Sequence, residues 1–236
     1  MATVDLTVRG EIELLIETQL AGLLSTSGEY YESIYAYHRC LEMAVQRFGT
    51  GSMWAILTNL NMAEVLFSAG FRQESLNRVR EMAKISADIY GEDHLFTFYC
   101  QLKLGTFLYR CSDYEEALTI LTPILPRALN VIGFRRSVHV CTIANMAHGY
   151  TGRPWQAFTS QRRLYRECLL QLGWRASETR FALKAVAITG WRFARVMNPP
   201  RIRLVWLVRQ AALEARLVWA TELRSASQRF RVRSRD

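Results

Sequence analysis

The sequence predicts an all-α protein made of antiparallel helix pairs that stack one on another. Three features recur at a nearly constant spacing: a glycine after an apolar phrase, a small residue inside the repeat, and a turn residue between its halves. The glycines are spaced by 42, 42 and 40 residues, and the small residues by 42 throughout. A period in this range indicates a solenoid of helical repeats. The glycines are Gly49, Gly91, Gly133 and Gly173; the small residues are Ala21, Ala63, Gly105 and Ala147; the turn residues are Gly28, Gly70 and Ser112.

Each repeat divides into two helical halves around its turn residue. In the second repeat, Ala63 and Leu66 precede Gly70, and Val79 and Met82 follow it. A small residue before the turn lets the two helices approach closely, while the apolar residues after it face the neighbouring repeat. The corresponding residues are Leu24, Tyr37 and Cys40 in the first repeat and Leu108, Leu121 and Ile124 in the third.

The end of each repeat carries signals for one helix to stop and another to start. Glycine is frequent just past a helix end because it adopts a positive φ without strain. Polar residues that can cap a new helix follow each glycine within about four positions. These candidate caps are Ser52, Asp93, Ser137 and Ser177.

The order of residues within a repeat resembles the tetratricopeptide (TPR) repeat, most plainly over residues 104–125. The length of the unit and the joint at residues 90–94 are similar to the TPR repeats of kinesin light chain and its relatives, which use a Gly-x-x-His-Pro joint. Here Leu95 stands where that joint has proline. The resemblance covers about residues 11–173 and implies a right-handed α-solenoid of antiparallel helix pairs that serves as a binding scaffold.

The chain is expected to divide into three parts. Residues 1–173 form four TPR-like helical hairpins, although the fourth turn is two residues shorter than the others. Residues 174–200 form the helix of a degenerate fifth repeat, with the small-residue pair due at residues 186–187. Proline at 199 and 200 would interrupt its partner helix. Residues 201–236 then form a basic C-terminal helix or cap with a disordered end.

The resemblance implies a concave groove lined by the first helices of the repeats. In similar proteins, asparagine at the positions of Asn61 and Asn145 holds the backbone of an extended peptide. Lys103 and Arg110 could hold an acidic side chain or a carboxylate by charge-assisted hydrogen bonds. The alternative is that these residues form ordinary solvated faces. The predicted groove residues are Asn61, Glu64, Phe67, Tyr99, Lys103, Thr106, Arg110, Asn145 and His148.

The positive charge is concentrated at the C-terminal end. The net charge is +9, yet residues 1–173 carry 16 basic and 17 acidic residues, and residues 174–236 carry 14 and 4. A second hypothesis is therefore an adaptor whose Arg-rich helix binds an anionic membrane or nucleic acid. The alternatives are a solvated cap and an arginine bias that comes from a GC-rich coding sequence. The arginines considered are Arg203, Arg209, Arg216 and Arg224.

No pattern in the sequence predicts catalysis, a cofactor, a metal or a small-molecule substrate. It has no phosphate-binding glycine loop, and its five cysteines are scattered without a CxxC pair, which indicates free thiols. Acidic residues near the N-terminus, where a secretory signal would be basic and then apolar, predict a cytoplasmic protein. A third hypothesis is an accessory protein of a biosynthetic pathway.

Overall fold

The computed structural model describes residues 2–196, 209, 212–213, 216 and 218. These residues form α-helices and no strand, as predicted. They belong to two compact units, Met1–Ser112 and Asp113–Asp236, each of which is described by itself. Most of the predicted C-terminal helix and its predicted disordered end lie outside the described residues.

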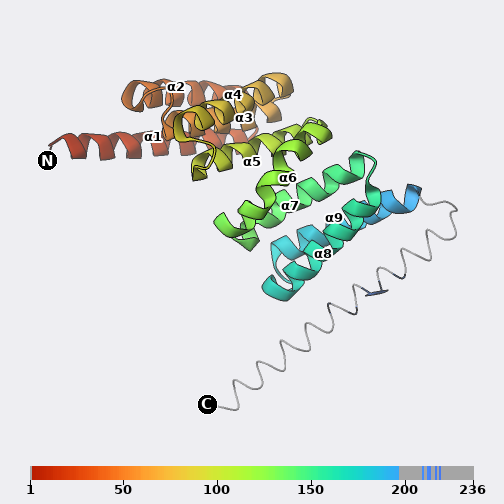
Figure 1. Cartoon of the computed structure of the whole chain (residues 1–236). Coiled ribbons are helices and arrows are strands. Elements are labelled where there is room, and N and C mark those ends of the chain that lie inside the picture. The colour runs from red at the N-terminus through yellow and green to blue at the C-terminus, as the bar shows by residue number, and fades with distance from the viewer. Residues whose placement is uncertain (1, 197–208, 210–211, 214–215, 217, 219–236) are drawn as a thin grey trace, which may run out of the picture. The chain divides into compact units, whose positions relative to one another are not determined.

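The helices of the first unit pack in chain order, each against the next (Figure 1). Successive helices run antiparallel and are joined by short turns. The first helix also contacts the third, as expected for stacked hairpins. The five helices are α1 (Ala2–Thr26), α2 (Tyr30–Phe48), α3 (Met53–Ser68), α4 (Arg72–Tyr90) and α5 (Leu95–Arg110).

The predicted small residues lie where the helices of a hairpin meet. Ala21 and Ala63 are fully buried. The Ser33 hydroxyl donates a hydrogen bond to the Ala21 carbonyl at 2.7 Å, and the Ser75 hydroxyl donates one to the Ala63 carbonyl at 2.8 Å. Two hairpins thus repeat the same contact between a small residue and a buried serine. Ser33 and Ser75 are 42 residues apart, so the sequence period is also a structural period.

The turn between the two halves of a repeat uses a left-handed backbone. Gly28 and Gly70 have φ of +88° and +97°, and Ser112 has φ of +72°. Positive φ costs a residue with a Cβ atom roughly 1 kcal/mol or more. The third repeat therefore keeps the turn geometry of the first two although it lacks their glycine.

The predicted helix caps are confirmed at one position and wrong at two. Ser52 caps α3 by accepting a hydrogen bond from the Ala55 amide at 3.2 Å. His94, not Asp93, caps α5, through a 3.1 Å hydrogen bond that its Nδ1 accepts from the Phe96 amide. Ser137 lies inside its helix, because that helix begins directly after a glycine, and its hydroxyl donates back to carbonyls of the first turn.

The second unit continues the pattern with α6, α7, α8 and α9. Pro123 and Pro126 lie inside α6 and remove two backbone donors from that helix. The last helix, α9, packs against both α7 and α8. It occupies the predicted 174–200 segment, but Ala187 is exposed and Gly190 is buried, so Ala187 is not the small contact residue. The helices are α6 (Tyr114–Val131), α7 (Phe134–Tyr150), α8 (Pro154–Leu172) and α9 (Ser177–Val196).

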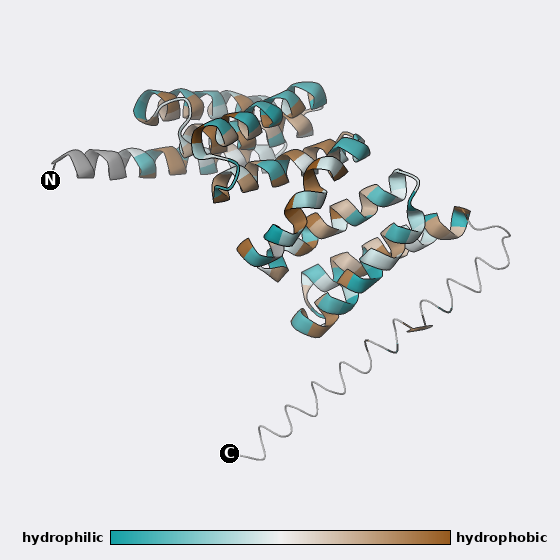
Figure 2. Cartoon of the chain, viewed as in Figure 1, coloured by the Kyte–Doolittle hydropathy of each residue, from teal (hydrophilic) through white to brown (hydrophobic). Residues whose placement is uncertain are grey.

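Hydrophobic and hydrophilic residues are mixed along every helix (Figure 2). In the first unit, buried side chains around Tyr37 and Met62 form one core cluster, and those around Leu14 and Cys40 form another. In the second unit, Phe158 and Tyr165 belong to a core between α7, α8 and α9. Among the described residues, no helix has the length and apolar character needed to cross a membrane.

Candidate functional site

Three predicted groove residues of the first unit meet in one ion-paired set. Glu64 projects from α3 toward Lys103 and Arg110 of α5. Lys103 Nζ lies 3.3 Å from Glu64 Oε1, and Arg110 Nη1 lies 2.5 Å from Glu64 Oε2. The three side chains are about one-third exposed. A carboxylate is therefore held at the surface between α3 and α5, as the sequence suggested, but it comes from the protein itself.

Aromatic rings lie directly beside this ion-paired set. The Arg110 guanidinium is 3.8 Å from the centroid of the Phe67 ring and 5.0 Å from that of Phe107. The two rings meet edge to face at 5.8 Å, and Phe107 is fully buried. The Arg72 guanidinium, from the start of α4, approaches the Phe67 ring at 5.7 Å. Such contacts favour a cation over the ring face.

We call these six residues the Glu64 cluster. Its cations outnumber its carboxylates three to one, because Glu64 alone faces Arg72, Lys103 and Arg110. Partly exposed ion pairs of this kind contribute about 1 kcal/mol or less each, since water screens them. The cluster can therefore exchange its internal carboxylate for an external one at small cost. Its members are Glu64, Phe67, Arg72, Lys103, Phe107 and Arg110.

The other predicted residues of the first unit flank the cluster. The Tyr99 ring lies 5.9 Å from Lys103 Nζ and stacks on the Phe96 ring at 6.4 Å. Thr106 donates its hydroxyl to the Leu102 carbonyl within its own helix at 2.9 Å. Asn61 is half-buried and makes no side-chain hydrogen bond to the described residues, so its amide can still donate and accept.

Asn145 and His148 belong to the second unit and form a separate set. Asn145 Nδ2 donates to Oε1 of the buried Gln161 at 3.1 Å, so part of its hydrogen-bonding capacity is used internally. His148 Nδ1 is buried without a hydrogen-bond partner among the described residues. Burial and the nearby Arg153 lower the pKa of His148, which favours the neutral ring.

Inspection of the sequence did not select Phe107, Arg72 or Gln161. Phe107 lies between the small residue Gly105 and Leu108 of the motif, and Arg72 directly follows a turn, so each looked like an ordinary helix residue. Gln161 carried a detectable signal, because it lies on the buried face of α8, four residues after Ala157. A polar residue at a core position indicates a buried hydrogen-bond network.

The arginines proposed for an anionic surface are described only in part. Arg209 and Arg216 are helical and exposed. Arg203 and Arg224 lie outside the described residues. Binding to an anionic surface therefore stays a prediction.

All five cysteines are free thiols, as predicted. Burial raises the pKa of Cys141 and of Cys168 to about 11. Since the thiolate is the reactive form, both side chains are protonated and weakly nucleophilic at neutral pH.

Solved structures with the same architecture have very different sequences. A putative kinesin light chain from Podosopora anserina, described as having nearly identical TPR-like repeats, is 13% identical to this chain. Its TM-score is 0.70, with 90% of this chain and 96% of that chain covered. A single-residue variant of it gives 12% identity, a TM-score of 0.71, and coverage of 91% and 97%.

BtubC (BKLC) from P. vanneervenii is also similar, with 14% identity, a TM-score of 0.61, and coverage of 71% of this chain and 68% of that chain. No family model and no curated protein matches the sequence. The comparisons confirm the predicted all-α fold with kinesin-light-chain-like TPR repeats.

Proposed function

We propose that this protein is a non-catalytic scaffold that binds an acidic peptide segment of a partner protein on the face formed by α3 and α5. TPR-like folds generally serve as protein-interaction scaffolds, which makes this the leading hypothesis. The observation that carries the proposal is the Glu64 cluster, in which three cations share one carboxylate beside exposed aromatic surface.

Exchange of carboxylates explains how a peptide would bind. An incoming Asp, Glu or C-terminal carboxylate would replace Glu64 on Lys103 and Arg110, forming charge-assisted hydrogen bonds with the same geometry. The Phe67 ring, next to Arg110, offers an apolar contact for a neighbouring side chain of the peptide. The amide of Asn61, one turn before Glu64 on α3, is available to a peptide backbone.

A binding experiment with selected peptides tests this proposal. Peptides from a phage-displayed random library are selected on the purified protein, and their dissociation constants are measured by fluorescence anisotropy. We expect the selected peptides to share an acidic group. The double variant Lys103→Gln/Arg110→Gln should weaken binding by about 100-fold, since two charge-assisted hydrogen bonds are lost. Glu64→Gln should tighten binding severalfold, because it removes the competing carboxylate.

The control is Lys84→Gln, which removes an exposed lysine of α4 that makes no ion pair among the described residues. It should leave the affinity unchanged. Melting curves show whether each variant is folded. Peptides that bind the double variant as tightly as the wild type, or a library that yields no binder, would contradict the proposal.

Two further functions stay open as predictions. The Arg-rich segment predicts binding to an anionic membrane or nucleic acid, which deletion of residues 201–236 would abolish at low salt. A role as an accessory protein of a biosynthetic pathway is the third hypothesis. A cytoplasmic location is part of the scaffold proposal.

A further inference from the structure

The outward face of α1 is apolar, which is unusual for the outermost helix of a repeat stack. The inner face of α1 buries Leu14 and Ala21 completely. On the other side, Ile16 is 54% and Leu20 is 50% exposed, although both are aliphatic. A terminal helix of a repeat array normally has a polar outer face, which keeps the array soluble. The exposed aliphatic residues, which recur at helical spacing, are Ile12, Leu15, Ile16, Leu20 and Leu23.

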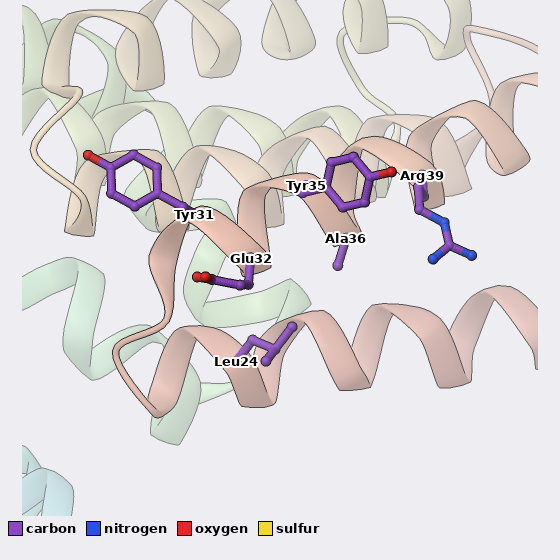
Figure 3. Close-up of a pocket in the computed structure, with 6 residues that line it drawn as sticks. All are labelled: Leu24, Tyr31, Glu32, Tyr35, Ala36 and Arg39. Carbon is purple, nitrogen blue, oxygen red and sulfur yellow. The ribbon is translucent and has the colours of Figure 1, made fainter.

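This apolar face continues onto α2. Leu24 of α1 lines an open hollow together with Tyr31, Tyr35 and Arg39 of α2 (Figure 3). Tyr31 is 72% and Tyr35 is 68% exposed, and they lie one helical turn apart. Tyrosine and arginine are the residues that most often carry the binding energy of protein interfaces. The surface therefore has the composition of an interface, and we call it the α1–α2 face.

The area of the α1–α2 face fits an interface between two proteins. The five exposed aliphatic residues and two tyrosines together expose on the order of 800 Å², which is what each partner contributes to a standard interface. Apolar patches on monomeric proteins seldom exceed roughly 600 Å². No described residue of the first unit covers this face.

The charges on the α1–α2 face are self-complementary. Glu32 and Arg39 both line the hollow, seven residues apart on the same side of α2, with Tyr35 and Ala36 midway between them. Neither charge has a hydrogen bond or ion pair within the part of the chain that the structure describes. In a two-fold symmetric contact, each residue meets the counterpart of its own partner. An axis between Tyr35 and Ala36 would place Glu32 of each copy beside Arg39 of the other.

We propose that the α1–α2 face binds a second copy of this chain, forming a two-fold symmetric dimer in which antiparallel α2 helices meet at Tyr35 and Ala36. The small Ala36 lets the helices approach, and the aliphatic face of α1 flanks the contact. The dimer uses no residue of the Glu64 cluster, so it stands independently of the proposed peptide binding.

Charge reversal tests the dimer directly. Sedimentation equilibrium of the full chain should give a dimer at micromolar concentrations. Glu32→Arg and Arg39→Glu should each weaken association by 10-fold or more, because each variant places two like-charged pairs across the axis. The double variant Glu32→Arg/Arg39→Glu should restore association to within about threefold of the wild type. A matched control is Glu74→Arg, which changes the equivalent residue one repeat later and should leave the mass unchanged.

Three outcomes would overturn the proposal: a wild-type protein that stays monomeric, a dimer insensitive to both single reversals, or a double variant that stays as weak as the single ones. Circular dichroism of every variant distinguishes a lost interface from a lost fold. A dimer that survives the single reversals would place its contact on another face.

Discussion

Replacing Gln161 with alanine is expected to lower the free energy of unfolding by about 4 kcal/mol. Gln161 is fully buried in α8 and links three helices. Its Nε2 donates to Thr142 Oγ1 at 3.3 Å and to the Ala182 carbonyl at 3.2 Å, and its Oε1 accepts from Asn145. Alanine would leave a cavity and two polar side chains without their partner. Urea denaturation measures the loss.

Two further variants separate the cavity from the hydrogen bonds. Gln161→Leu fills most of the volume but accepts and donates nothing, so we expect a loss of about 2 kcal/mol. Gln156→Ala truncates an exposed glutamine of the same helix and should change stability by less than about 0.5 kcal/mol. If Gln161→Ala costs no more than Gln156→Ala, the buried network does not hold α7, α8 and α9 together.

Enlarging Ala63 to leucine is expected to cost about 3 kcal/mol. Ala63 is fully buried where α3 meets α4, and its carbonyl accepts the hydroxyl proton of Ser75 at 2.8 Å. Three extra carbon atoms would push the two helices apart and break this hydrogen bond. The free energy of unfolding, measured by chemical denaturation, should fall accordingly.

The matched control for this variant is Ala187→Leu, which enlarges an exposed alanine of α9. We expect that change to alter stability by about 0.5 kcal/mol or less, since nothing opposes the larger side chain. Equal effects of the two variants would mean that Ala63 is not a contact residue and that its recurrence every 42 residues has no structural role.

The repeat architecture could be predicted because its signals are local. A positive φ at a turn and a small residue at a helix contact each act on one position, so their spacing is visible in the sequence. The same reasoning explains the errors. His94 and Asp93 are adjacent polar residues, and only the backbone direction decides which one caps α5. Ala187 was misplaced because the last repeat is shorter, which changes the face that each residue presents.

The candidate site could be predicted only as a face. Helical period identifies Glu64, Lys103 and Arg110 as neighbours, but it does not say that the two cations pair with Glu64. Pairing depends on side-chain torsions and on the distance between α3 and α5. Phe107 escaped notice because a buried phenylalanine in an apolar helix looks like core. Here it supports the ring beneath Arg110.

Residue-resolved hydrogen–deuterium exchange tests the ladder of helix pairs most directly. Slow exchange should follow α2, α3, α4 and α5, interrupted by fast exchange at residues 49–52, 69–71 and 91–94. Protected segments should therefore recur with the period of the glycines. Continuous protection through any of these turns, or fast exchange throughout a helix between Tyr30 and Arg110, would contradict the predicted repeat structure.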